Sequence, residues 1–152
     1  RQRQMCIRDS LGDIQYTQEE IDFALELQRN NGKPEIGIDG KIRPLRETLN
    51  SPGGGSTDSG DVSYNVPVVS LAATTAPKGV PWHSWSVVAS SGMSIGHKGM
   101  LHAAKALGMT MVDIFKDGKL RENIKKEFDE KIGEYEYDPY LDPGPPPIDY
   151  VD

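Results

Sequence analysis

The sequence contains few of the residues that most directly indicate a protein's chemistry. Cys6 is the single cysteine among 152 residues, which excludes an internal disulfide framework and any zinc site built from several cysteines. No segment approaches the ~20 consecutive apolar residues that span a bilayer, and no secretory signal pattern is present. We therefore expect a soluble, cytoplasmic protein that has no membrane partner.

Basic and apolar residues are also scarce. The net charge is −6 and no stripe of Lys and Arg exists, so nucleic acid is not expected as a ligand. Hydrophobic residues make up 36% of the chain and are concentrated in residues 66–115, whereas residues 31–65 and 134–152 contain few. Either the poorer parts are loops, or the chain belongs to a larger protein whose other parts bury its apolar surface.

The first ten residues show no initiator methionine and no periodicity before a clear helix signal begins. They are either the scar of a truncation or an ordinary disordered terminus. We therefore exclude residues 1–10 and expect the domain to occupy residues 11–152.

Helical patterns occur in three places. Thr17 and Glu20 fit a capping box, in which a hydroxyl and a carboxylate three residues apart satisfy the free amides at a helix start. Apolar residues at helical spacing predict one capped helix, one long buried helix and one surface helix, over residues 18–30, 98–116 and 119–132.

Two short strands are predicted between these helices. Residues 66–73 are an apolar run rich in β-branched side chains, which is typical of a buried strand when Pro67 lies at its start or on an edge. Residues 84–89 are expected to form a second short strand, and residues 33–52, which are rich in Pro and Gly, a loop. Helices combined with buried strands predict an α/β fold.

A glycine-rich segment over residues 53–63 carries hydroxyls and carboxylates. It does not match a phosphate-binding loop, because no lysine follows the glycines and because Asp58 and Asp61 would repel a phosphate. Ser56, Thr57 and Asp58 could contact a substrate; alternatively, Asp58 or Asp61 could cap a short helix that follows. A hydrolase that uses the two aspartates as acid and base is a weaker possibility, since nothing separates their pKa values.

Two histidines could be metal ligands. His83 lies between Trp82 and Trp85, and His97 lies just before the long helix. An imidazole binds zinc or manganese through one nitrogen while a nearby acceptor orients the other. For both residues the alternative is a histidine whose nitrogens are hydrogen-bonded to the backbone.

Three blocks of sequence carry most of these polar groups. They read Gly-Ser-Thr-Asp-Ser-Gly-Asp-Val-Ser, Pro-Trp-His-Ser-Trp and Ser-Ile-Gly-His-Lys-Gly-Met-Leu-His-Ala-Ala-Lys, over residues 55–63, 81–85 and 94–105. In content and order they resemble the C-terminal part of the M20-family metallo-amidohydrolases. The closest branch of that family is the one that contains aminobenzoyl-glutamate hydrolase.

The resemblance implies a fold and a reaction. The fold is a three-layer, metallopeptidase-like α/β catalytic domain, interrupted by a smaller lid domain through which the full-length enzyme dimerises. Two divalent metal ions, zinc or manganese, activate a water that attacks the amide of a small-molecule substrate, and a glutamate acts as the general base.

The resemblance also implies site residues in this chain. His83 is in the place of the last metal ligand, with His97 as the second choice. A substrate-binding loop near the metals is ordered by Asp61. The residues of this loop are Ser56, Thr57 and Asp58.

Several parts of the family's site are absent from the sequence. There is no His-x-Asp motif, no bridging aspartate and no lid domain, and the adjacent Glu19 and Glu20 begin a helix. The chain is therefore expected to be the C-terminal segment of a metal-dependent amidohydrolase that cleaves an N-acyl amino acid or an aminobenzoyl-glutamate-like amide. The general base and the other ligands would lie upstream, and the segment alone should be inactive.

A different class of function remains open. Trp82 and Trp85 could form the rim of a non-enzymatic module that binds a small ligand or a partner. Metal-ligand motifs encoded upstream of residue 1 would favour the enzyme. A start codon at that point without such motifs would favour the binding module.

Overall fold

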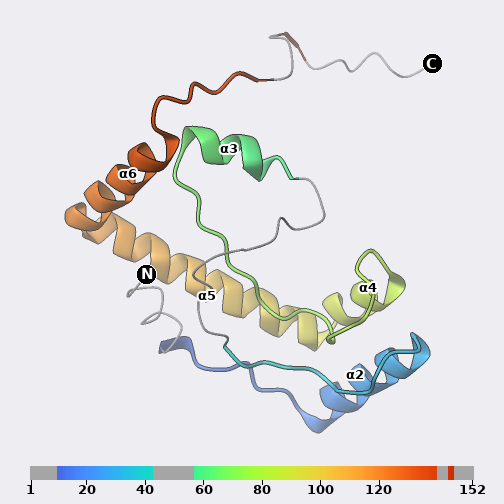
Figure 1. Cartoon of the computed structure of the whole chain (residues 1–152). Helices are drawn as coiled ribbons and strands as arrows, with labels where there is room; N and C mark the ends of the chain where they lie inside the picture. The colour runs from blue at the N-terminus through green and yellow to red at the C-terminus, as the bar shows by residue number, and fades with distance from the viewer. Residues whose placement is uncertain (1–9, 43–56, 140–143, 146–152) are drawn as a thin grey trace. The chain divides into compact units, whose positions relative to one another are not determined.

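The computed structural model describes residues 10–42, 57–139 and 144–145 of the chain (Figure 1). The chain divides into a first unit, Arg1–Ser51 with Ser70–Gly118, and a second unit, Pro52–Val69 with Lys119–Asp152. The regular elements in the described ranges are helices. They are α2 (Gln18–Asn30), α4 (Trp85–Ser91) and α5 (Ser94–Lys116) in the first unit, and α3 (Ser59–Asn65) and nearly all of α6 (Gly118–Ile132) in the second.

Both ends of α2 are capped by residues that suit the position. The Thr17 hydroxyl accepts a hydrogen bond from the Glu20 N–H at 3.3 Å, and the Glu20 carboxylate accepts one from the Thr17 N–H at 2.7 Å, which completes the predicted capping box. At the other end Gly32 has a φ of 62°, and the N–H of Lys33 donates to the carbonyl of Gln28 at 2.9 Å. The predicted helix is confirmed with the same bounds.

The core of the first unit depends on a buried amide. Gln28 is 0% exposed, and its Nε2 donates to the carbonyls of Gly37 and Lys78, each at 2.9 Å. Its Oε1 accepts from the N–H of Gly37 at 2.8 Å, so the side chain is satisfied and joins three segments. The buried aliphatic residues of the described part are Ala24, Leu27, Val80 and Ile95, and the buried polar ones are Glu20, Gln28, Ser86 and Ser90.

An ion pair joins α2 to α5. Lys98 Nζ lies 2.6 Å from Glu20 Oε2 and also donates to the carbonyl of Gln15 at 2.9 Å. Burial of the Glu20 carboxyl would raise its pKa, but hydrogen bonds from the Lys98 and Ser94 side chains and from a backbone N–H, together with the Lys98 charge, lower that pKa to about 2. The carboxylate is therefore ionised and paired at neutral pH.

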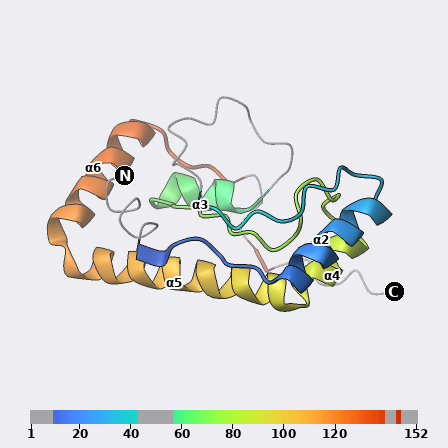
Figure 2. The ribbon, with the colours of Figure 1, turned by 90° about the horizontal axis from the view of Figure 1, so that it is seen from below.

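Two glycines allow α5 to approach its neighbours closely. A Cβ atom at Gly96 would lie 2.1 Å from the carbonyl oxygen of Ser91, at the end of α4. A Cβ atom at Gly99 would lie 2.2 Å from the carbonyl oxygen of Thr74. As a result α4 folds back beside the first turns of α5, which both ribbon views show (Figures 1 and 2).

Neither predicted strand is present among the described residues. Residues 66–73 form an extended and largely exposed chain, and an extended run becomes a strand only when a neighbour completes its hydrogen bonds. Pro67 also lacks an N–H to donate. Residues 84–89 instead enter α4, where Ser86 and Ser90 lie one turn apart and are both buried. The expectation of an α/β fold with short buried strands is therefore wrong for this structure.

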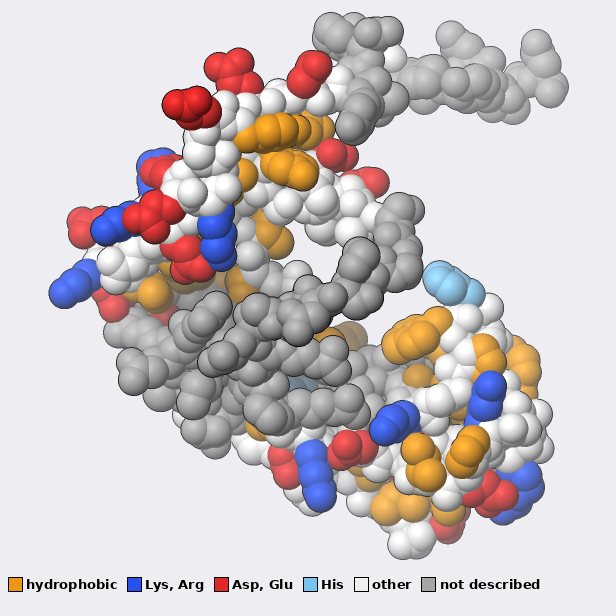
Figure 3. Space-filling model, in the orientation of Figure 1, with side chains coloured by type: hydrophobic (Ala, Val, Ile, Leu, Met, Phe, Trp, Pro, Cys, Tyr) orange, Lys and Arg blue, Asp and Glu red, His pale blue; other side chains and the backbone are white. Residues whose placement is uncertain are grey.

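The long helix has the predicted spacing but is not buried. α5 begins at Ser94, four residues before the predicted start, and ends at Lys116 as expected. Periodicity marks an apolar face, but it cannot show whether anything covers that face. The buried residues of α5 are Ile95, Gly96 and Gly99, all in its first two turns. Figure 3 shows hydrophobic side chains gathered at the surface of the protein.

The second unit is held together by aromatic and charged contacts. Neither α3 nor α6 has a buried residue. The ring centroid of Tyr64 lies 4.9 Å from that of Tyr135 and 6.2 Å from that of Tyr137. On α6, Lys131 pairs with Glu127 at 2.6 Å. The predicted surface helix is confirmed and begins one residue earlier than expected.

Some predictions fall on residues that the structure does not describe. These are the leader, apart from residue 10, and the loop from residue 43 to residue 52. Of the helices in the described ranges, none is both long enough and apolar enough to cross a membrane.

The Glu20–Lys98 pair predicts how acid affects the first unit. Because the pKa of Glu20 is lowered from 4.5 to about 2, its stabilisation is complete above about pH 4.5 and is lost as the pH falls towards about 2. The variant Glu20→Gln should lower the free energy of unfolding at pH 7 by roughly 2 kcal/mol and should flatten this acid-dependent loss.

Urea unfolding followed by tryptophan fluorescence measures this effect, since both tryptophans belong to the first unit. The exposed neighbour Glu19, changed to Gln, is the matched control and should behave like the unchanged chain. Equal acid sensitivity of Glu20→Gln and the unchanged chain would contradict the assignment.

Candidate functional site

The predicted substrate loop leads directly into α3. Thr57 Oγ1 accepts from the N–H of Ser59 at 3.3 Å and donates to the Ser59 hydroxyl at 3.2 Å. This local turn sets the start of the helix. Thr57, Asp58 and Asp61 are all exposed at this end of α3. The structure therefore brings these three predicted residues together, while Ser56 lies outside the described residues.

Asp58 does not cap the helix. It occupies the N-cap position of α3, but its side chain makes no hydrogen bond there. Its φ of −65° and ψ of −13° are helical, whereas a capping side chain requires an extended backbone to reach back to the helix amides. Of the two alternatives for this residue, capping is wrong, and the exposed carboxylate is left for contact with a ligand.

Asp61 is tied to the chain that follows α6. The Tyr137 side chain is hydrogen-bonded to its carboxylate; burial first, and then the charge of Asp61 and this bond, raise the pKa of Tyr137. The rings of Tyr135 and Tyr137 also contact Tyr64, on the same helix as Asp61. α3 has seven residues, which is too short for a stable isolated helix, so these contacts hold it. The ordering role of Asp61 stays a prediction with this physical basis.

His83 has an unusual backbone. Its φ is 60°, and it is the one residue other than glycine with a positive φ in the described part of the chain. Ser84 Oγ donates to the carbonyl of Pro81 at 2.5 Å and closes the turn that contains His83. A positive φ at this point of a turn normally selects glycine, because a Cβ atom is strained there.

The His83 ring is exposed between two exposed indoles. Trp82 is 70% exposed and Trp85 57% exposed. Within the described ranges no residue is hydrogen-bonded to the His83 imidazole. The alternative of a histidine satisfied by the backbone is therefore not realised at this position, and both ring nitrogens are accessible.

The structure does not assemble the predicted metal ligands into one centre. His97 is exposed in the first turn of α5, in the same unit as His83, while the loop with Asp58 and Asp61 belongs to the second unit. Over the residues that the structure describes, no group of three His, Cys, Asp or Glu side chains could hold a metal ion. Any complete centre therefore needs ligands from elsewhere.

Sequence reasoning missed a cluster of ionisable groups around Lys98. Its Nζ lies 5.6 Å from the centroid of the Tyr16 ring, in addition to its contact with Glu20. The Tyr16 hydroxyl is buried and lacks a hydrogen-bond partner among the described residues, and burial, followed by the charges of Glu20 and Asp39, raises its pKa to about 12. Lys98 lies 78 residues from Glu20, and no local pattern links them.

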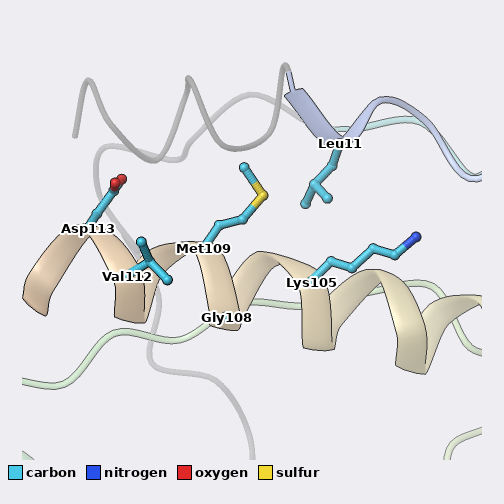
Figure 4. Close-up of a pocket in the computed structure, with 6 residues that line it drawn as sticks. All are labelled: Leu11, Lys105, Gly108, Met109, Val112 and Asp113. Carbon is cyan, nitrogen blue, oxygen red and sulfur yellow. The ribbon is translucent and has the colours of Figure 1, made fainter. Parts of the chain in front are cut away.

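A hollow of about 490 Å³ lies on α5, apart from every predicted site residue. Leu11 faces the helix across it, and Gly108 leaves room in its floor (Figure 4). The hollow is lined by Leu11, Lys105, Gly108, Met109, Val112 and Asp113. Apolar side chains dominate this lining, so the hollow suits an apolar group rather than catalysis.

Comparison with known proteins relates the sequence to a hydrolase. The chain is similar to p-aminobenzoyl-glutamate hydrolase of Escherichia coli strain K12, in the subunit designated B. The two sequences are 33% identical over 140 residues, which covers 76% of this chain and 29% of the relative. This chain therefore spans less than a third of the relative's length. No protein-family model matches the sequence, and no solved structure matches it.

The similarity supports a hydrolase-related protein and the resemblance found in the sequence. It extends well beyond the three short blocks, so it does not depend on a single glycine-rich or histidine-containing motif. The relative's name marks it as one subunit of an assembly.

The strained turn at His83 predicts an opposition between stability and ligand binding. The variant His83→Gly should raise the free energy of unfolding of the first unit by about 1 kcal/mol, because glycine adopts the positive φ without strain. His83→Ala should give no such gain, since alanine also carries a Cβ atom. Urea unfolding monitored by tryptophan fluorescence distinguishes the two, and a gain for alanine equal to that for glycine would show that no strain is stored there.

The Asp61–Tyr137 contact predicts how firmly the substrate loop is held. The variant Tyr137→Phe should make the amides of α3 exchange with solvent several times faster, because Asp61 loses its partner. Tyr135→Phe is the matched control, because it keeps the ring that contacts Tyr64. Hydrogen exchange measured by mass spectrometry over residues 57–65 should separate the variants, and unchanged exchange in Tyr137→Phe would remove the basis for an ordering role of Asp61.

Proposed function

We propose that this chain is the C-terminal part of the catalytic domain of an M20-type metallo-amidohydrolase, which acts on aminobenzoyl-glutamate or a related N-acyl amino acid. The observation that carries the proposal is the exposed imidazole of His83, held in a strained turn with no hydrogen-bond partner in the described ranges. The similarity to p-aminobenzoyl-glutamate hydrolase supports it independently.

The accessible ring fits one ligand position of a zinc or manganese site. Imidazole is a common ligand of both metals, and strain in a turn is often retained where it fixes the direction of a functional side chain. The described residues supply no complete set of ligands, so the other ligands and the general base would come from the rest of the enzyme. When bound, a pair of such metals would supply an activated water for attack on the amide.

The remaining predicted residues would serve the substrate. Thr57 and Asp58 are exposed at the start of α3 and can form hydrogen bonds with polar groups of an amide substrate. Asp61, through Tyr137, would keep that loop in one conformation. Ser56 is proposed for the same loop on its sequence position alone. Association with a partner polypeptide, and a dimer of the full-length enzyme, belong to this proposal as well.

A chimera tests the proposal. The segment of the Escherichia coli relative that matches this chain is replaced by this chain, and release of p-aminobenzoate is measured with added zinc or manganese. We expect His83→Ala to lower kcat/KM by about 100-fold or more and to lower the metal content, because a ligand is lost. His97→Ala should retain most of both.

Two results would contradict the proposal. One is unchanged activity and metal content in His83→Ala, with loss in His97→Ala assigning the ligand to that second histidine instead. The other is metal-dependent amide hydrolysis by the purified 152-residue chain alone, which would mean that the site is complete without further ligands.

A binding module is the second candidate, because Trp82 and Trp85 are both largely exposed. Exposed indoles are suited to stack on an aromatic ligand. In that case the purified chain with EDTA should bind p-aminobenzoyl-glutamate with a change in tryptophan fluorescence, and Trp82→Ala should abolish the change. The amidohydrolase proposal expects no such binding without metal.

A further inference from the structure

The outward face of α5 is the largest apolar feature that the proposed function leaves unused. At 100° per residue, five exposed side chains fall within an arc of about 140° on one side of the helix. They are Met100, Leu101, Leu107, Met111 and Val112. We call this set the outer face of α5.

The outer face has the character of an interior surface. In a helix of a complete domain, the apolar stripe is directed at the core, and an apolar arc of this width is typical of a buried side. In α5 the burial stops at Gly99, and no residue from Met100 to Lys116 is buried. The helix therefore directs its most apolar side away from its own unit.

The outer face is also shaped to receive another element. Ala104 and Gly108 lie along its centre, between larger side chains, so a second backbone could approach closely. A Cβ atom added at Gly108 would meet nothing within 4 Å. The hollow beside Val112 and Met109 adjoins this face, with Leu11 as its opposite wall (Figure 4).

We infer that the outer face of α5 packs against the part of a polypeptide like the Escherichia coli relative that this chain does not span. The relative is more than three times as long as the region it shares with this chain, since that region is 29% of it. Charged side chains stay at the margin of the face, at Lys105 and Lys116, which suits a dry contact within one domain. The inference rests on the similarity to this relative and not on its proposed chemistry.

The test is co-purification. The Escherichia coli relative, lacking its matching segment and carrying an affinity tag, is co-expressed with this chain, and the amount of this chain recovered with it is measured. The unchanged chain should be recovered, and the double variant Leu107→Lys/Met111→Lys should reduce recovery by about tenfold or more. Val88→Lys is the matched control: this α4 residue is 73% exposed, lies outside the outer face, and should leave recovery unchanged.

A second variant guards against a simple loss of folding. Gly108→Leu fills the centre of the outer face without a clash inside the chain and favours the helix, so the chain itself should stay folded by circular dichroism. Recovery with the tagged polypeptide should nevertheless fall by about tenfold, because the approach is blocked.

Three results would overturn the inference. These are no recovery of the unchanged chain, equal recovery of all variants, and a dimer of the purified chain that Leu107→Lys/Met111→Lys converts to a monomer in sedimentation velocity. The last result would assign the outer face to a second copy of this chain. A recovered complex that hydrolyses no amide would instead count against the proposed function and leave this inference intact.

Discussion

The buried side chain of Gln28 is the contact on which the first unit most depends. It satisfies backbone groups of two segments that have no regular structure and would otherwise be unpaired in the interior. Because one of these segments contains Gly37 and the other Lys78, the amide fixes where both chains run against α2. The turn that presents His83 begins only three residues after Lys78, so its position depends on this polar contact.

Polar links take a large share of the cohesion because the apolar core is small. Four aliphatic side chains are buried in the described part of the chain, alongside four polar ones, whereas a protein of this length ordinarily buries a much larger apolar core. The candidate site has the same character, since a turn orients one imidazole and a short helix orients two loop residues without completing a centre. Both features are expected of a segment that holds the margin of a core and of a site whose other parts lie elsewhere.

The sequence alone determined the features that depend on neighbouring residues. The capping box at Thr17, the glycine stop at Gly32 and the periodicity of α6 each place the residues that interact within a few positions of one another, so their outcome could be predicted. The motif around His83 was also recognisable, because it is local. The predicted helices toward both ends of the chain are accordingly confirmed.

Tertiary structure decided everything that needs a distant partner. The run at 66–73 has strand-forming side chains but no neighbour in the described ranges to pair with, and the apolar side of α5 has no cover there. The pairing of Lys98 with Glu20, and of Asp61 with Tyr137, joins residues too far apart for any local pattern to reveal. The physical reason is that hydrogen bonds and burial are properties of pairs of segments, whereas a sequence pattern describes only one segment at a time.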